Sequence, residues 1–180
     1  YRDLAQVFVD RQFIVLVPDY RGHNASEGAA FTQRPDAPGL YARDSVAAYR
    51  SLDGIGHIDR SRQYMLGHSM GGLVTLAALG VIGDEFNAAS VWSSMALNGH
   101  AKLLADVNVP LLVQHAQADE STSAQGAIEI FRALQSAGVR AHLELYPGGD
   151  HLFRGRQFLE AVARDVAWFA RHSTGGDSLR

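Results

Sequence analysis

The chain has 180 residues, of which 47% are hydrophobic and 19% are charged, and its formal net charge is −3. This composition is typical of a soluble globular protein, and the slightly negative charge gives no basis for a nucleic-acid or anionic-membrane partner. The lack of cysteine excludes disulfides, thiol nucleophiles and thiolate metal sites. No apolar run approaches the ~18 residues of a membrane-spanning helix. Residues 1–10 contain no apolar signal segment, which favours a cytoplasmic location.

Apolar runs alternate with amphipathic stretches along the chain. Residues 1–11 have the pattern of a helix, and residues 13–18 (FIVLVP) have that of a strand buried on both faces. Further strands are predicted at 64–66, 88–92, 109–114 and, from a weaker pattern, 143–146. Apolar residues recurring at intervals of three and four predict helices at 42–52, 70–79, 123–137 and 153–172.

This alternation predicts an α/β fold with a mostly parallel sheet flanked by helices, in which residues 1–172 form a single domain. The connection between the strands at 88–92 and 109–114 is short and holds one helical patch at 101–105, so no cap domain is expected. The polar, glycine-rich residues 173–180 are expected to form a flexible tail.

Residues 64–76 (YMLGHSMGGLVTL) contain a G-x-S-x-G motif at Gly67, Ser69 and Gly71. An apolar strand ends before the serine and a helical pattern begins after it, which is the setting in which this motif displays a nucleophile. The N–H groups at the start of the helix would then face a developing oxyanion. The alternative is a glycine-rich turn whose serine only caps the helix.

Two later strand ends carry the acid and the base that a serine nucleophile needs. Asp119 follows the strand at 109–114, and His151 follows the strand at 143–146. Parallel strands end at the same edge of a sheet, and the chain order serine, acid, histidine is that of this fold. The sequence therefore predicts a Ser69–His151–Asp119 triad.

Other acidic residues are weaker candidates for the acid. Glu120 is an alternative to Asp119 with a less favourable reach, and Asp150 adjoins His151 in the chain, so their side chains diverge. Asp19 precedes the serine in the chain, so it is expected to tie down its own loop with Arg21.

The remaining histidines are interpreted as structural. His68 adjoins the serine and is expected to pack at the turn, and His115 is expected to be buried and hydrogen-bonded. The other histidines lack the spacing of metal ligands. Neither a metal nor a cofactor is predicted.

Four segments together resemble the α/β-hydrolase superfamily, and within it the catalytic domains of the prolyl oligopeptidase family and dienelactone hydrolase-like esterases. They are residues 4–28 (LAQVFVDRQFIVLVPDYRGHNASEG), 57–72 (HIDRSRQYMLGHSMGG), 109–123 (VPLLVQHAQADESTS) and 146–153 (YPGGDHLF). The resemblance implies the nucleophile Ser69, the acid Asp119 and the base His151. It also implies that the N–H of Met70 is one oxyanion donor.

The sequence departs from this family in two ways. Ala116 stands where related sequences usually have glycine. In the family, an interior strand and a turn that supplies the second oxyanion donor come before the helix that here begins at Tyr1. The fold is therefore expected to be shortened at its N-terminus, either as an incomplete hydrolase or as a minimal variant in which strand 13–18 pairs directly with strand 64–66. The loop at 20–24 is then a candidate source of the second donor, and the open sheet edge is expected to support a homodimer.

The predicted function is that of a carboxylesterase acting on small, short-chain acyl esters through an acyl-enzyme. Alternatives are a prolyl oligopeptidase-like serine peptidase acting on short peptides, and a catalytically inactive binding module. Tyr20 and Trp92 are predicted to line the substrate pocket, with Met95 and Phe31 as further candidates.

Overall fold

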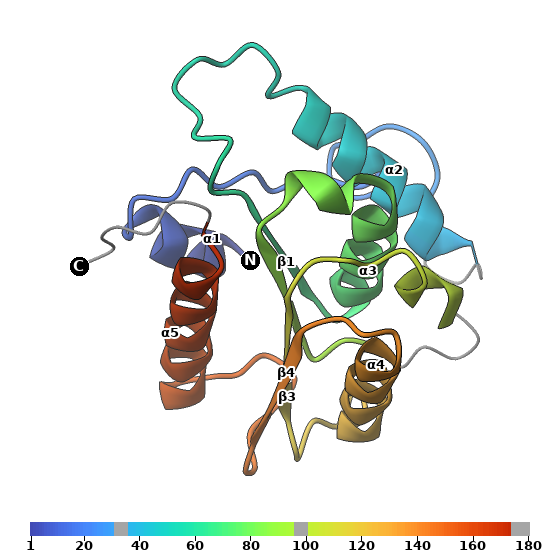
Figure 1. Ribbon diagram of the computed structural model, residues 1–180, viewed down its shortest axis with the longest axis vertical. Coiled ribbons are helices and arrows are strands. Elements are labelled where there is room, and N and C mark those ends of the chain that lie inside the picture. Colours follow the sequence, from blue (N-terminus) through green and yellow to red (C-terminus); the bar gives the residue numbers. More distant parts are fainter. Residues whose placement is uncertain (31–35, 96–100, 174–180) are drawn as a thin grey trace. The chain divides into compact units, whose positions relative to one another are not determined.

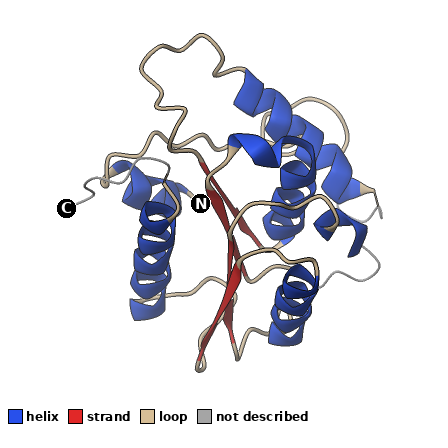
Figure 2. Cartoon of the chain, in the orientation of Figure 1, coloured by secondary structure: helices blue, strands red, loops and turns tan. Residues whose placement is uncertain are grey.

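The computed structural model describes residues 1–30, 36–95 and 101–173 of the chain. The chain divides into two compact units, Tyr1–Asp59 and Arg60–Arg180. Figure 2 shows that all described strands lie in one sheet, which belongs to the second unit. Apart from Ser173, the predicted tail at 173–180 lies outside the described residues.

The first unit contains two of the predicted helices. Helix α1 (Arg2–Val9) confirms the helix predicted at 1–11. Helix α2 (Ala37–Arg50) begins five residues before the predicted start at 42. Its first turn contains Pro38, which is tolerated there because the first N–H groups of a helix have no partner within it.

The strand predicted at 13–18 is not formed, and that prediction is wrong. These residues run without strand pairing among the described part of the chain, and Ile14, Leu16 and Val17 are 62%, 42% and 59% exposed. An apolar run becomes a strand only where another strand lies beside it to satisfy its N–H and C=O groups. The direct pairing of residues 13–18 with the strand at 64–66 is therefore also not formed.

A polar network holds the loop that follows residues 13–18. The guanidinium of Arg21 donates to Asp44 of α2, with Nε 2.9 Å from Oδ1. This hydrogen bond holds the pKa of Asp44 below its usual range. Asp19 accepts from Nδ2 of Asn24 at 2.7 Å. Asp19 thus holds its own loop, as expected, but through Asn24, since Arg21 pairs with the helix instead.

The second unit is built on a four-stranded sheet in which every strand is parallel and the spatial order follows the chain. The strands are β1 (Tyr64–His68), β2 (Ala88–Trp92), β3 (Leu111–Ala116) and β4 (Ala141–Tyr146). All four confirm predicted strands. The two central strands, β2 and β3, are buried along their whole length, which explains why they appear in the sequence as continuous apolar runs.

Helices cover both faces of this sheet (Figure 1). Helices α3 (Met70–Ile82) and α4 (Ala124–Ser136) pack on one face, and α5 (Arg156–Arg171) packs on the other. Two short 3₁₀ helices, η1 (Gly83–Glu85) and η2 (Ala101–Leu104), lie in the connections. Among the described residues, none of the helices combines the length and the apolar character needed to cross a membrane.

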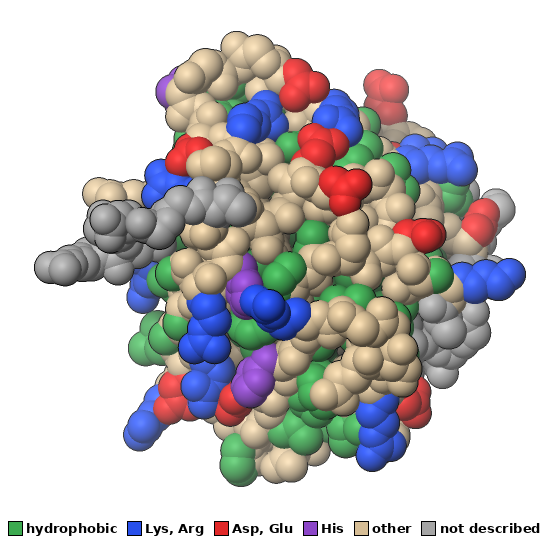
Figure 3. Space-filling model, in the orientation of Figure 1, with side chains coloured by type: hydrophobic (Ala, Val, Ile, Leu, Met, Phe, Trp, Pro, Cys, Tyr) green, Lys and Arg blue, Asp and Glu red, His purple; other side chains and the backbone are tan. Residues whose placement is uncertain are grey.

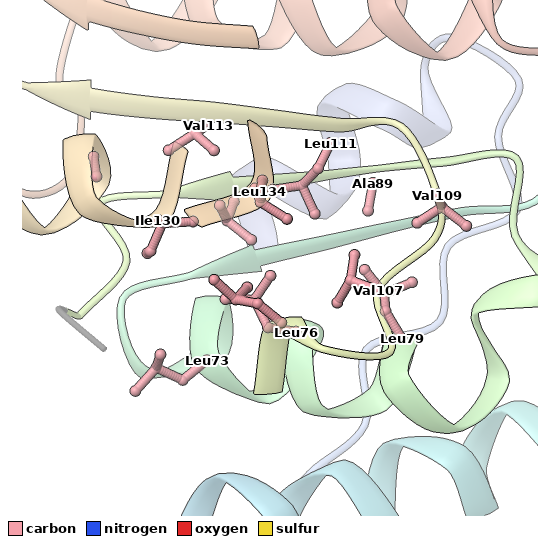
Figure 4. Packing of buried hydrophobic residues seen from close by; sticks show 13 residues of the cluster. Leu73, Leu76, Leu79, Ala89, Val107, Val109, Leu111, Val113, Ile130 and Leu134 are labelled. Atoms are coloured by element: carbon pink, nitrogen blue, oxygen red, sulfur yellow. The ribbon is translucent and has the colours of Figure 1, made fainter. Parts of the chain in front are cut away.

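The main core lies between the sheet and the α3–α4 layer (Figure 4). Leu76 and Leu79 of α3 meet Leu111 of β3, with Ile130 and Leu134 from α4, and all five are essentially inaccessible to solvent. Burying a side chain of this size contributes about 1.5–3 kcal/mol. This packing fixes the carboxyl ends of the strands, from which the loops described below extend.

Candidate active site

Ser69 lies on the turn between β1 and α3. Its backbone has φ 58° and ψ −122°, a conformation that residues other than glycine rarely adopt. The turn is held because the N–H of Ser69 donates to the carbonyl of Trp92 and the N–H of Gly72 donates to the carbonyl of Ser69, both at 2.9 Å. Strain of this kind persists where the surrounding structure over-determines a position, as at functional sites.

Two glycines allow this tight turn. A Cβ at Gly67 would lie 2.1 Å from the carbonyl oxygen of Gly71, and a Cβ at Gly72 would lie 2.4 Å from Oγ of Ser94. Both distances are far inside van der Waals contact, so the close approach of β1, α3 and the end of β2 requires glycine at these positions. The predicted strand–turn–helix setting of Ser69 is confirmed.

Ser69, His151 and Asp119 form one hydrogen-bonded line. Nε2 of His151 lies 2.9 Å from Oγ of Ser69, and Nδ1 of His151 lies 2.8 Å from Oδ2 of Asp119. His151 comes from the β4–α5 loop and Asp119 from the β3–α4 loop, so three separate strand ends bring the side chains together. The structure therefore assembles the three residues that the sequence predicts as nucleophile, base and acid.

The carboxylate of Asp119 has no exposed surface but is well supplied with donors. Its Oδ1 accepts from the N–H groups of Ser121 at 2.8 Å and Thr122 at 2.9 Å. Burial alone would raise the pKa of Asp119. The backbone bond from Thr122, the bond to His151 and smaller contributions outweigh it and hold the pKa well below its usual range. Asp119 is therefore ionised at neutral pH and fixes the proton of His151 on Nδ1.

The loop that carries His151 is held on both sides of the histidine. Asp150 accepts from the N–H of Leu152 and pairs with Arg154 at 2.7 Å, so it faces away from the imidazole, as expected. Phe153 is fully buried, and its ring packs against those of Trp92 and Tyr146. Its φ of 53° is unusual for a bulky side chain, and the aromatic contacts offset that cost.

Two further histidines adjoin the line. Nε2 of His68 lies 2.7 Å from the carbonyl oxygen of His151, and the two rings are 4.6 Å apart. His115 is fully buried, with Nε2 3.0 Å from the carbonyl of Thr122. Carbonyl oxygens only accept, so both Nε2 atoms carry the proton. Burial lowers the pKa of both histidines and favours their neutral form. His115 is buried and hydrogen-bonded, as the sequence predicts, whereas the sequence predicts only packing at the turn for His68.

Sequence reasoning missed two contacts of this site. The side chain of His68 binds the backbone of His151, and the hydroxyl of Thr122 lies 2.9 Å from Oδ2 of Asp119. The only signal for Thr122 is its place three residues after the predicted acid, where N–H and hydroxyl groups commonly bond an aspartate. Glu120, the alternative acid, is exposed.

Met70 is the first residue of α3, directly after Ser69. The first N–H groups of a helix have no partner within it and are positioned to bind an anion. Met70 is thus placed as a backbone donor beside Ser69, and its role in an oxyanion hole stays a prediction. The loop at 20–24 lies in the first unit, so its proposed second donor also stays a prediction.

The predicted substrate-lining residues lie in different places. Trp92 is 2% exposed and packs against Phe153 and Phe158, so it belongs to the core and not to an open pocket. Tyr20 belongs to the first unit, where its ring stacks on Tyr41 with 4.8 Å between centroids. Met95 follows β2 in the second unit and is 40% exposed. Phe31 lies outside the described residues.

The arrangement is suited to nucleophilic catalysis by a serine. With its proton on Nδ1, His151 presents the Nε2 lone pair to the Ser69 hydroxyl, and Asp119 stabilises the imidazolium that proton transfer creates. Within the described residues, no cluster of histidine and acidic side chains has the arrangement of a metal site.

Comparisons with known proteins identify the family and the fold. A model of the dienelactone hydrolase family matches residues 1–171. A comparison with curated proteins gives no match. The chain is similar in structure to a predicted CIB-like hydrolase from Thermoplasma acidophilum, with 17% identity, TM-score 0.71, and 92% of this chain and 77% of that one covered.

Peptidases and a second hydrolase share the same fold. Pyrococcus horikoshii acylaminoacyl peptidase is 17% identical with TM-score 0.66, covering 77% of this chain and 28% of that one. A candidate dienelactone hydrolase from Klebsiella pneumoniae is 22% identical with TM-score 0.64, covering 78% and 63%. The chain spans only about a quarter of the peptidases that it matches, 23% of Porphyromonas gingivalis dipeptidyl peptidase 4 and 28% of the Pyrococcus enzyme.

These structural likenesses show the fold. The described residues form a four-stranded parallel sheet flanked by helices, a partial α/β-hydrolase fold without a cap domain. The match to the family model extends over nearly the whole chain. The protein is a member of the dienelactone hydrolase family.

Proposed function

We propose that the protein is a carboxylesterase that hydrolyses small, short-chain acyl esters through a covalent intermediate on Ser69. The observation that carries the proposal is the continuous hydrogen-bonded line from Ser69 through His151 to Asp119. Membership in a hydrolase family supports the reaction class.

The proposed reaction has two halves. His151 Nε2 takes the proton of Ser69 Oγ while that oxygen attacks the ester carbonyl, and the oxyanion faces the N–H of Met70. The C–O bond to the alcohol then breaks, and the Nε2 proton goes to the leaving oxygen. Water next attacks the acyl-enzyme while Nε2 takes its proton. The carboxylic acid product then leaves, and the Ser69 hydroxyl is restored. Asp119 accepts the Nδ1–H bond throughout.

The surroundings of Ser69 support a small, uncharged substrate. The N–H of Met95 donates to the carbonyl of Ser69 at 3.4 Å, and Leu152 directly follows His151. Met95 and Leu152 are 40% and 49% exposed, so exposed apolar residues adjoin the reacting ones. Both basic and acidic side chains are visible on the face shown in Figure 3, and the net charge of the chain is −3.

The test is hydrolysis of p-nitrophenyl acetate by the wild type and by Ser69→Ala. We expect turnover by the wild type and a loss of at least about 10⁴-fold in the variant, because no acyl-enzyme can form without the Ser69 hydroxyl. Ser136→Ala, an exposed serine at the end of α4, is the matched control and should keep full activity. Equal rates for wild type and Ser69→Ala would refute the proposal.

A peptidase is the second candidate, because several of the similar solved structures are peptidases. Comparing p-nitrophenyl acetate with an aminoacyl p-nitroanilide separates the two, since only a peptidase cleaves the amide at a comparable rate. A fluorophosphonate that labels Ser69 supports either enzyme. Absence of both labelling and turnover would indicate the inactive binding module instead.

A further inference from the structure

The hydroxyl of Thr122 lies in the middle of the polar groups that hold the acid and the base. Its Oγ1 is 2.9 Å from Oδ2 of Asp119, 3.2 Å from Nδ1 of His151 and 3.0 Å from the carbonyl oxygen of Ser93. Nε2 of His115 is 3.5 Å away. No other hydroxyl among the described residues has a hydrogen bond of this kind to both Asp119 and His151.

The protons of the Thr122 hydroxyl and of His151 Nδ1 can be placed, because some of the neighbouring groups can only accept hydrogen bonds. The Ser93 carbonyl and the ionised carboxylate of Asp119 accept only, and the hydroxyl has one proton to give. The Nδ1 proton of His151 is directed to Oδ2 of Asp119 at 2.8 Å. A hydrogen bond to a charged acceptor is the stronger of the two available to the hydroxyl. Thr122 therefore donates its one proton to the same carboxylate oxygen that binds His151, and the Ser93 carbonyl is the alternative acceptor.

The backbone of Thr122 is held from both sides, which fixes where its hydroxyl points. Its N–H donates to Oδ1 of Asp119 at 2.9 Å, and its carbonyl accepts from Nε2 of His115 at 3.0 Å. His115 is fully buried, so this bond is shielded from water. Thr122 thus contacts both oxygens of Asp119, one through its backbone and one through its side chain.

We propose that Thr122 is a positioning residue whose hydroxyl fixes the Asp119 carboxylate, and through it the imidazole of His151, in line with Ser69. A carboxylate with donors on both oxygens cannot rotate freely, so Oδ2 stays directed at Nδ1. The kinetic consequence of this inference rests on the proposed function. The geometric consequence, an ordered bond between His151 and Asp119, does not.

The test compares Thr122→Val, which removes the hydroxyl at nearly constant shape, with Thr122→Ser, which keeps it. We expect Thr122→Val to lower kcat by about 10- to 100-fold, the effect of losing a hydrogen bond to a charged group, with little change in KM. Thr122→Ser should stay within about threefold of the wild type. Equal losses in both variants, a larger loss in Thr122→Ser, or a change in KM alone would overturn the proposal, because none of these results follows from loss of the hydroxyl.

A spectroscopic readout separates this inference from the proposed function. The proton between His151 Nδ1 and Asp119 should give a far-downfield ¹H NMR signal, assigned by its loss in His151→Ala. We expect it in the wild type and Thr122→Ser, and broadened or absent in Thr122→Val at the same pH. An unchanged signal in Thr122→Val would overturn the positioning role. If the wild type proves inactive while the signal still depends on the hydroxyl, the proposed function fails and the positioning role stands.

Discussion

Two aspartates of this protein have no exposed side-chain surface, yet their environments act on them in opposite directions. Asp119 lies beyond the carboxyl end of β3, beside His151. Asp165 lies in α5, on the face turned to the sheet, and its Oδ1 accepts from Nε2 of Gln114 at 2.7 Å. Burial raises the pKa of Asp165 to about 7, whereas the pKa of Asp119 is held well below its usual range.

The difference comes from the donors that each carboxyl meets. Asp119 receives two backbone N–H groups, a hydroxyl and an imidazole, which stabilise its negative charge. Asp165 faces uncharged side-chain donors, among which the Gln114 amide is oriented by the Tyr146 hydroxyl that donates to its oxygen. Burial alone therefore does not decide whether an acid is charged. The donors around Asp119 keep it negatively charged, whereas burial in the core favours the protonated, uncharged form of Asp165.

The largest expected effect tests whether the charge of Asp119 matters for the reaction. Asp119→Asn keeps the shape but presents an uncharged amide to His151, so kcat for p-nitrophenyl acetate should fall by about 10⁴-fold. Glu120→Gln, at the exposed neighbouring position, is the control and should be unaffected. The assignment of the acid would be wrong if the two variants behaved alike.

The next effect concerns Asp165 and the pH dependence of stability. Because its pKa is raised from 3.8 to about 7 in the folded state, the wild type should lose stability as pH rises from about 4 to about 7. Asp165→Asn removes this loss. The difference in free energy of unfolding between the two proteins should change by about 4 kcal/mol across that window.

Urea unfolding of both proteins at several pH values from 4 to 8 measures this difference. All other groups are common to the two chains, so their titrations cancel. If the free energies of unfolding of the two proteins changed with pH in parallel, the pKa of Asp165 would not be raised by folding. The contrast drawn between Asp165 and Asp119 would then be wrong.

Urea unfolding of the wild type and Asp119→Asn from pH 7 down to pH 2 should give a slope of the opposite sign. A lowered pKa contributes stability that is present above about pH 4 and is lost as the pH falls further. The wild type should therefore exceed Asp119→Asn by about 2 kcal/mol at neutral pH, with the gap closing towards pH 2. A gap that is constant down to pH 2 would mean that the donors around Asp119 do not favour its charged form.

The smallest expected effect concerns His68, which contacts His151, the partner of Asp119, through a hydrogen bond to its carbonyl and through its ring. His68→Phe removes the bond to the His151 carbonyl and should lower kcat by about tenfold. His68→Gln can place an N–H near the same position and should recover most of that loss. Identical rates for the two variants would show that the ring packing, and not the hydrogen bond, supports His151.

The sequence predicts the line of Ser69, His151 and Asp119 because each follows a strand, and parallel strands all end at one edge of a sheet. This inference needs only the order of elements and no side-chain geometry. The G-x-S-x-G motif also marks the tight turn through Gly67 and Gly71, and the structure confirms the close approach at Gly67 and adds Gly72, just beyond the motif.

The remaining features depend on which segments lie beside one another, and the pattern of one segment does not contain that information. Residues 13–18 have the composition of a strand, but no strand pairs with them among the described residues. Trp92 is apolar and near a strand end, which fits a pocket or a core equally well, and the rings of Phe153 and Phe158 place it in the core. The contacts of Thr122 and His68 depend on loop conformations in the same way.

The parallel sheet places the three aligned side chains and the turn around Gly138 at opposite ends of the second unit, which allows the protein to be attached to a support away from Ser69. The three aligned side chains all lie beyond the carboxyl ends of the strands, whereas the turn around Gly138 leads into the amino end of β4. A Cβ at Gly138 would meet nothing within 4 Å, although its φ of 76° favours glycine itself. An exposed neighbour such as Ala137 is therefore a suitable place for a cysteine. Because the chain has no other thiol, that cysteine would attach the protein to a support through one point, at the end of the second unit opposite Ser69.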